Sequence, residues 1–319
     1  MGRVADREKT LMKYRATALL LLSGCAGHQG IQQKADNWTP TVSTPQFTAD
    51  AGPRVLVDAA HGNFHKIDGR FAAFARLLRA DGYRVASADK SISPELLSAA
   101  DVFVIANAVK GGEDAQWVLP TPPALAPEEV TALVKWVHDG GGLLLIADHM
   151  PFPGSVAELA DAFGIAFRNG YAIKSVSAGG SVIFTRSGGL ADHAITRGRN
   201  AAEQITALKT FTGQAFSAVV PVEPLIRMPD DWAVFFPQEA GKFTSTTPSE
   251  STRGLLQGAV LRHGQGRVAV FGEAAMFTAQ TQILGDTVVA RMGMNDPEAA
   301  QNSQFVLNVL HWLSGLLQD

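Results

Sequence analysis

The sequence predicts an α/β fold with a doubly wound, mostly parallel sheet and a smaller strand-rich insertion. Short apolar runs alternate with helical patterns over most of the chain. This alternation is typical of parallel sheets, in which a helix connects each strand to the next. From about residue 170 to 255, scattered Thr, Ser, Pro and Gly break the pattern, which indicates short antiparallel strands at one edge of the sheet.

The expected strands are short apolar runs, the pattern of strands buried on both faces. They cover residues 55–58, 83–86, 102–105, 143–146 and 268–271.

Helices are expected between these strands. Phe71 and Phe74 begin a helical spacing that ends at Gly82, and residues 127–137 place apolar side chains on one face. The last helix spans residues 305–313. Asn308 and His311 fall opposite its apolar face and are predicted to face solvent.

The first 24 residues have the layout of a secretory signal peptide, a basic segment before an apolar stretch, with Met12 as an alternative start. The apolar stretch is shorter than the ~20 residues that span a membrane. Its end, Leu22-Ser23-Gly24-Cys25, resembles the lipobox of bacterial lipoproteins. The resemblance implies lipidation of Cys25, a lipid bilayer as partner and a periplasm-facing location in the cell envelope. Ala26 after the cysteine favours the outer membrane.

Residues 25–52 are predicted to be a lipidated N-terminus and flexible tether, because they are polar and rich in Gly, Gln, Thr and Pro. The α/β domain is expected over residues 53–319. Cys25 is the only cysteine, so the domain has neither a disulfide nor a catalytic thiol. The net charge of −3 and the absence of long like-charge blocks give no sign of nucleic-acid binding.

Ligands of a doubly wound sheet bind beyond the carboxyl ends of its strands. The polar residues that follow the expected strands are therefore candidates for a site. They are Asp58, His61, Asn63 and His65 after the first strand, Asn107 after the third, Asp148 and His149 after the fourth, and Glu273 after the last.

Three of these residues are candidate catalytic groups: His61 and His149 as bases, and Glu273 as a base or as the group that orients a histidine. The other candidates, Asp58, Asn63, His65, Asn107 and Asp148, are expected to bind ligand. For His61 and His65 three roles stay open: holding the turn, contacting substrate, or binding a divalent metal together with a carboxylate. No cofactor is otherwise expected.

Side chains alternate along a regular strand, so Asp148 and His149 are expected to diverge, one entering the site and the other bracing the loop. The segment 192–198 is predicted to be a structural turn that delivers Thr196 and Gly198 to a tight bend. The sequence has no Gly-x-Ser-x-Gly elbow, phosphate-binding loop or dinucleotide fingerprint.

Three segments resemble known families. Residues 125–149, with Gly140-Gly141-Gly142 before an apolar run and Asp148-His149 after it, resemble the central segment of class I glutamine amidotransferase-like proteins, ThuA-like and DUF4350-type proteins in particular. Residues 192–198 resemble their His-Pro-Ile-Thr-x-Gly turn, with alanine in place of proline, and residues 266–272 resemble the closing strand of DUF4350 proteins. The resemblance implies a flavodoxin-like sheet.

Active amidotransferases use a Cys-His-Glu triad, and this chain offers no cysteine there. The link of ThuA-like proteins to sugar metabolism hints at a carbohydrate ligand. Three functions follow as hypotheses: a lipoprotein that binds a small polar ligand such as a carbohydrate or cell-wall fragment; a hydrolase with His and Glu acid–base residues, with or without a metal; or a non-catalytic envelope scaffold.

Overall fold

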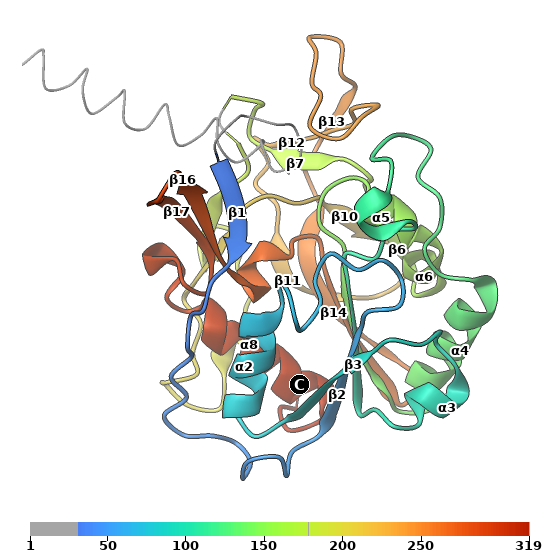
Figure 1. Ribbon diagram of the computed structural model, residues 1–319, viewed down its shortest axis with the longest axis vertical. Coiled ribbons are helices and arrows are strands. Elements are labelled where there is room, and N and C mark those ends of the chain that lie inside the picture. The colour runs from blue at the N-terminus through green and yellow to red at the C-terminus, as the bar shows by residue number, and fades with distance from the viewer. Residues whose placement is uncertain (1–30, 178, 319) are drawn as a thin grey trace, which may run out of the picture.

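The computed structural model describes residues 31–177 and 179–318, which form a mixed α/β fold around a nine-stranded sheet (Figure 1). Five neighbouring strands of the sheet run parallel. In spatial order they are β3 (Arg84–Ala88), β2 (Arg54–Asp58), β4 (Val102–Ala106), β5 (Gly142–Ile146) and β15 (Gly266–Phe271). They correspond to the five predicted strands. Because β3 and β4 flank β2 on opposite sides, the chain reverses its progress across the sheet at β2.

The apolar runs of the parallel strands feed two cores, one on each face of the sheet. In β2, Val55 and Val57 join one core and Leu56 joins the other. In β4, Phe103 and Ile105 lie in the same core as Leu56. Side chains alternate between the faces of a strand, so an unbroken apolar run is what burial on both sides requires.

Helices cover both faces. The first core contains residues of α2 (Ala72–Ala80) and α8 (Asn302–Leu313). The second contains residues of α3 (Pro94–Leu97), α4 (Pro127–His138) and α6 (Ala157–Ala162). Shorter helical segments are α5 (Phe152–Ser155), α7 (Ala194–Arg197), η1 (Gly112–Asp114), η2 (Ala275–Phe277) and η3 (Pro297–Ala299).

The rest of the main sheet is antiparallel. Beyond β15 it continues through β14 (Leu256–His263), β10 (Phe216–Ala218) and β6 (Ile165–Phe167), and β11 (Glu223–Arg227) also pairs with β14. Two small antiparallel sheets complete the segment predicted as an insertion. They are β7 (Tyr171–Ile173) with β12 (Ala233–Phe235) and β13 (Ser249–Ser251), and β8 (Val182–Thr185) with β9 (Ala207–Thr210). The short strands of residues 170–255 are thus antiparallel, as expected.

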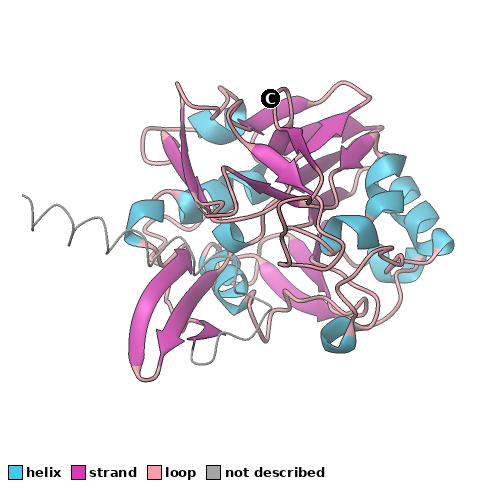
Figure 2. Cartoon of the chain, turned by 90° about the horizontal axis from the view of Figure 1, so that it is seen from above, coloured by secondary structure: helices cyan, strands magenta, loops and turns pink. Residues whose placement is uncertain are grey.

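The segment predicted to be a flexible tether differs from expectation where the structure describes it. Residues Ile31–Ala35 form β1, which pairs antiparallel with β16 (Ala279–Leu284) of a sheet completed by β17 (Thr287–Gly293) (Figures 1 and 2). Trp38 and Phe47 then pack against the first core. Backbone pairing and these aromatic anchors hold the segment against the domain.

The predicted signal peptide and Cys25 lie outside the described residues. Within residues 31–177 and 179–318, no helix combines the length and the apolar character needed to cross a bilayer.

The prediction that His311 faces solvent was wrong. His311 is 2% exposed, and its Nε2 lies 2.7 Å from Oδ2 of Asp81. Asn308 is also buried and donates to the carbonyl oxygens of Ile195 and Glu203 at 2.7 and 2.8 Å. The polar face of α8 is covered by neighbouring segments that supply hydrogen-bond partners, and these partners offset the cost of burying it.

The turn at residues 192–198 is structural, as predicted. Nδ1 of His193 accepts the Ile195 N–H at 3.1 Å at the start of α7. The Thr196 hydroxyl donates to the Ala191 carbonyl oxygen at 2.7 Å, and Gly198 closes the bend with φ 64°.

Candidate functional site

A small polar cavity of about 60 Å³ lies beyond the carboxyl ends of β5 and β15. We call it the rim cavity. Four of the predicted site residues line it, namely His65, Asp148, His149 and Glu273. The other lining residues are Gln33, Arg70, Phe152, Thr212, Ala275, Gln280 and Met292. Five ionisable side chains from separate segments therefore surround one small volume.

Glu273 is positioned by the close approach of two chain segments. Gly272 precedes it, and a Cβ at Gly272 would lie 2.5 Å from the carbonyl oxygen of Gln214. The Gln214 N–H donates to the Gly272 carbonyl oxygen at 2.8 Å. The glycine therefore lets β15 end directly against the segment that also supplies Thr212 to the rim cavity.

The Glu273 carboxyl is fully buried and accepts the N–H groups of Ala275 and Met276, both at 2.8 Å. These bonds favour its charged form. Burial opposes them and raises the pKa of Glu273 well above its usual value, and the neighbouring charge of Asp148 raises it further.

The pKa of Asp148 is also raised by burial, although the charge of His149 pulls it down. Asp148 and Glu273 thus form a carboxyl pair that resists double ionisation. Such a pair retains a proton that it can donate.

His149 presents one ring nitrogen to the rim cavity in a fixed tautomer. Its Nδ1 lies 2.7 Å from the carbonyl oxygen of Met150, which only accepts hydrogen bonds, so Nδ1 carries the proton. Nε2 then has a lone pair and no hydrogen-bond partner among the described residues. The ring stacks on Tyr171 with centroids 4.5 Å apart and planes 14° apart. A histidine held in this way can accept a proton or a ligand hydrogen bond.

His65 is buried, and its Nδ1 has no hydrogen-bond partner among the described residues. Its ring packs edge-on against Phe71 with centroids 5.0 Å apart. Burial lowers the pKa of His65, and the charges of Arg70 and His149 lower it further. The ring is therefore neutral. A buried polar atom without a partner costs about 1–3 kcal/mol, which a ligand atom would recover.

His61 belongs to a separate cluster and does not line the rim cavity. Its Nδ1 lies 2.9 Å from both carboxylate oxygens of Asp58, and its Nε2 lies 3.0 Å from Oε1 of Glu129. Asn63 donates to Asp58 at 2.9 Å. Burial alone would lower the pKa of His61, but the hydrogen bonds and charges of Asp58 and Glu129 outweigh it and raise the pKa to about 9.

Asp58, His61 and Asn63 therefore do not join the hollow in which they were expected. Glu129 adds to their cluster by accepting the N–H groups of Ile92 and Ala126 at 2.9 and 2.8 Å. The cluster ties the loop after β2 to the start of α4.

Asn107 has a supporting place next to the rim cavity. It follows β4 with a positive φ of 49°, and its Oδ1 accepts the Asp148 N–H at 2.8 Å. Asp148 and His149 both line the cavity, contrary to the expected divergence. The reason is that β5 ends at Ile146, so the two residues lie in a turn, where side chains do not alternate.

Sequence reasoning missed Arg70, Gln33 and Gln280. An arginine just before a helix gives no signal of a site, and Arg70 reaches the cavity with its guanidinium 5.1 Å from the Phe64 ring centroid. Gln33 donates to Oε1 of Gln280 at 2.7 Å. Their strands pair across the sheet of β1 and β16, a contact between residues far apart in the sequence.

Within residues 31–177 and 179–318, no group of three or more His, Cys, Asp and Glu side chains is arranged to hold a metal ion. What the rim cavity offers is proton transfer and hydrogen bonding, from His149, the carboxyl pair and Arg70.

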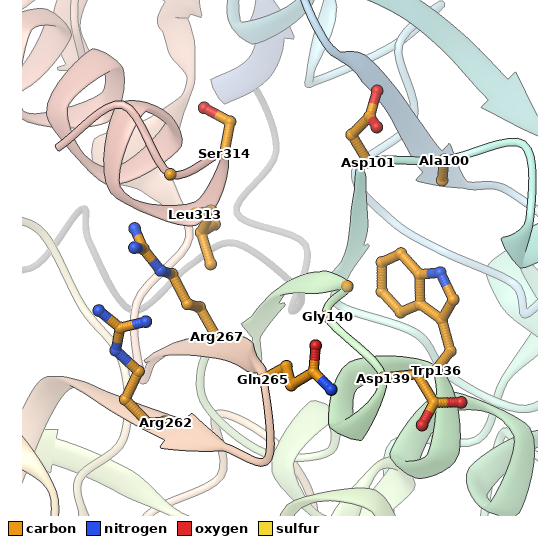
Figure 3. A pocket seen from close by; sticks show the side chains of 12 residues that line it. Ala100, Asp101, Trp136, Asp139, Gly140, Arg262, Gln265, Arg267, Leu313 and Ser314 are labelled. Atoms are coloured by element: carbon orange, nitrogen blue, oxygen red, sulfur yellow. The ribbon is translucent and has the colours of Figure 1, made fainter. Parts of the chain in front are cut away.

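A larger hollow of about 470 Å³ lies at the opposite edge of the sheet, at the amino ends of β5 and β15 (Figure 3). Two of its charged groups are engaged in holding the fold. Asp101 accepts the Arg54 N–H at 2.7 Å, and Arg267 donates to the carbonyl oxygen of Leu317 at 3.0 Å. The hollow therefore shows fewer signs of a site than the rim cavity.

No protein-family model matches the chain, and no curated protein sequence is significantly similar to it. Solved structures are similar in fold. The mmIFT52 N-terminal domain has a TM-score of 0.55 and 16% identity, over 82% of this chain and 97% of that domain. At this identity the similarity concerns the fold alone.

Two further structures are more distant. A ThuA-like protein from Bacteroides uniformis ATCC 8492 has a TM-score of 0.44 and 10% identity, over 86% of this chain and 94% of that one. A GMP synthase protein from Thermoplasma acidophilum has a TM-score of 0.39 and 12% identity, over 82% of this chain and 94% of that one.

Proposed function

We propose that this protein is a lipid-anchored protein of the bacterial cell envelope whose amidotransferase-like domain binds a small polar ligand in the rim cavity. One observation carries the ligand proposal: the buried ring of His65 and the oriented ring of His149 each turn a nitrogen without a partner toward the same enclosed volume. Buried polar groups are otherwise satisfied in folded proteins.

The size of the cavity restricts the ligand. A water molecule needs roughly 10–15 Å³ of such volume, so about 60 Å³ admits a few waters or one small group of a larger molecule. Arg70 suits a carboxylate, and the imidazole nitrogens and carboxyl pair suit hydroxyl groups. Sugars, sugar acids and cell-wall fragments carry both kinds of group.

A screen of such compounds by thermal shift tests the proposal. We expect at least one to raise the melting temperature of the parent chain and not that of His149→Ala. His138→Ala is the matched control, because His138 lies exposed on α4, away from the cavity. A ligand that stabilises His149→Ala as much as the parent would contradict a site at the rim cavity.

A hydrolytic function is the second candidate, and the carboxyl pair of Asp148 and Glu273 favours it. Nε2 of His149 would take a proton from water, and the pair would give its proton to the leaving group. His61 is replaced in this role by His149, because carboxylates occupy both ring nitrogens of His61. Product formation from a ligand found in the screen, lost in His149→Ala and Glu273→Gln, would support hydrolysis; an unchanged ligand would leave binding alone.

The anchor is proposed from the lipobox at Cys25. Expression of the full chain in a diderm bacterium with an alkyne-labelled fatty acid should give a labelled protein in the outer-membrane fraction. Cys25→Ser should be unlabelled and should leave the membrane. Label on the Cys25→Ser variant, or none on the parent, would refute the anchor.

A further inference from the structure

The hairpin of β16 and β17 exposes an apolar tip. Gly285, with φ 60°, and Asp286 form its two-residue turn, in which a glycine at the first position is favoured. Around the turn, Leu284, Val288 and Val289 are 49%, 43% and 39% exposed. Among the described residues, these are three of the eight large hydrophobic side chains that face solvent. We call them the hairpin tip.

A register shift increases the apolar surface. Gln282 pairs with Ala290 and Ile283 with Val288, so Val289 is the extra residue of a β-bulge. The bulge exposes two consecutive valines where regular alternation would turn one inward. An exposed hairpin end gains nothing from valine in folding, so the tip needs a partner to account for it.

The place where the chain enters the described fold identifies the partner. In the register of β1 and β16, Ile31 pairs with Leu284, so the chain arrives beside the hairpin tip (Figure 1). Six residue steps separate Ile31 from Cys25. An extended chain spans at most about 3.6 Å per residue, so the backbone of Cys25 lies within roughly 20 Å of Ile31. A lipid on Cys25 would hold the tip close to the bilayer.

Charges near the tip fit a lipid surface. Lys34 and Arg291 are exposed, and both pair with Thr281, three residues from Leu284 along β16. Three residues of a strand span about 10 Å, so the two cations lie at the height where lipid phosphates would meet a tip dipped to that depth. Asp286 opposes deeper insertion, because a carboxylate in hydrocarbon is costly.

We infer that the hairpin tip docks in the headgroup region of the bilayer that holds the acyl chains of Cys25. This inference rests on the proposed anchor. Docking would fix how the domain stands on the membrane. It would also orient the rim cavity, because Gln33, Gln280 and Met292 of the same three-stranded sheet line that cavity.

The test uses the full lipidated chain, reconstituted in vesicles of phosphatidylethanolamine and phosphatidylglycerol. Lipidation blocks the thiol of Cys25, so a polarity-sensitive fluorophore can be attached at Thr287→Cys at the tip. The matched control is Glu95→Cys on α3, on the other side of the fold in Figure 1. We expect a blue-shifted emission and quenching by brominated lipids at position 287, and neither at 95.

Each other outcome is decisive. Lipidated protein with an unshifted, unquenched label at 287 would overturn docking and leave the anchor intact. Energy transfer between labelled copies without lipid quenching would assign the tip to a second copy of the chain, which also overturns it. Thiol labelling of Cys25 in the parent would refute the anchor and the docking with it. Leu284→Ser/Val288→Ser/Val289→Ser, checked for folding by circular dichroism, should abolish the lipid quenching.

Discussion

The ring of His149 lies nearly parallel to that of Tyr171, with centroids 4.5 Å apart and 14° between the planes. The stack and the Met150 carbonyl together fix the direction of His149 Nε2. Orientation of one nitrogen by a bond at the other is how proteins set the tautomer of a functional histidine.

This arrangement predicts the tautomer of His149. Long-range nitrogen–proton spectra of the parent chain should show the neutral ring protonated at Nδ1. Tyr171→Leu should give a mixture of tautomers, because the ring loses its stacking partner, whereas Tyr171→Phe should keep the parent pattern. A parent ring protonated at Nε2 would contradict the hydrogen bond to Met150.

Removal of His61 should destabilise the fold. His61→Ala would leave the carboxylates of Asp58 and Glu129 without their shared cation, and breaking a buried pair in this way costs about 3–5 kcal/mol. Urea unfolding at neutral pH measures the loss. His138→Ala, at an exposed position, should change stability by less than about 0.5 kcal/mol. Equal effects of the two variants would show that the His61 cluster does not stabilise the fold.

The same cluster predicts a pH dependence. The pKa of His61 rises from 6.5 to about 9 on folding, so its stabilising contribution is complete below pH 6.5 and is lost as pH rises through 9. The free energy of unfolding should fall over that interval in the parent, and fall less in His61→Ala. A parallel pH dependence of both chains would contradict the charged state of His61.

Glu273 predicts the same direction in a different pH range. Its folded pKa lies well above 4.5, so its contribution to stability is present below pH 4.5 and is lost as pH rises through the folded pKa. Relative to the parent, Glu273→Gln should therefore gain stability as pH rises from 4.5 to 8. Glu158→Gln, at an exposed position of α6, should track the parent. A constant difference between Glu273→Gln and the parent would show an ordinary pKa for Glu273.

His65 should show a conflict between stability and function. His65→Phe removes the unpartnered Nδ1 and keeps a ring against Phe71, so stability should stay level or rise by up to about 1–3 kcal/mol. Ligand-induced thermal shift should be lost at the same time. A destabilised variant would mean that His65 Nδ1 is satisfied in the folded chain.

Much of the fold follows from the sequence because the parallel strands are buried on both faces. That burial requires unbroken apolar runs such as residues 143–146, and the parallel direction then brings the residues after these runs to one edge. Asp148, His149 and Glu273 meet at the rim cavity for this reason.

Other features depend on contacts that no local pattern records. His61 and His65 share one loop, but Gly62, with φ 63°, turns the chain between them, and only His65 reaches the cavity. Residues 31–35 are polar and carry no strand pattern; pairing with β16 makes them a strand. His311 falls on a polar helix face, but Asp81 covers that face.

Histidine-selective nitrogen labelling gives the most direct measurement on the rim cavity. With a sugar or sugar acid that raises the melting temperature, titration should shift the ring signals of His65 and His149 together and leave those of His61, His138 and His263 in place. Shifts at His61, His138 or His263 with His65 and His149 unmoved would contradict ligand binding in the rim cavity.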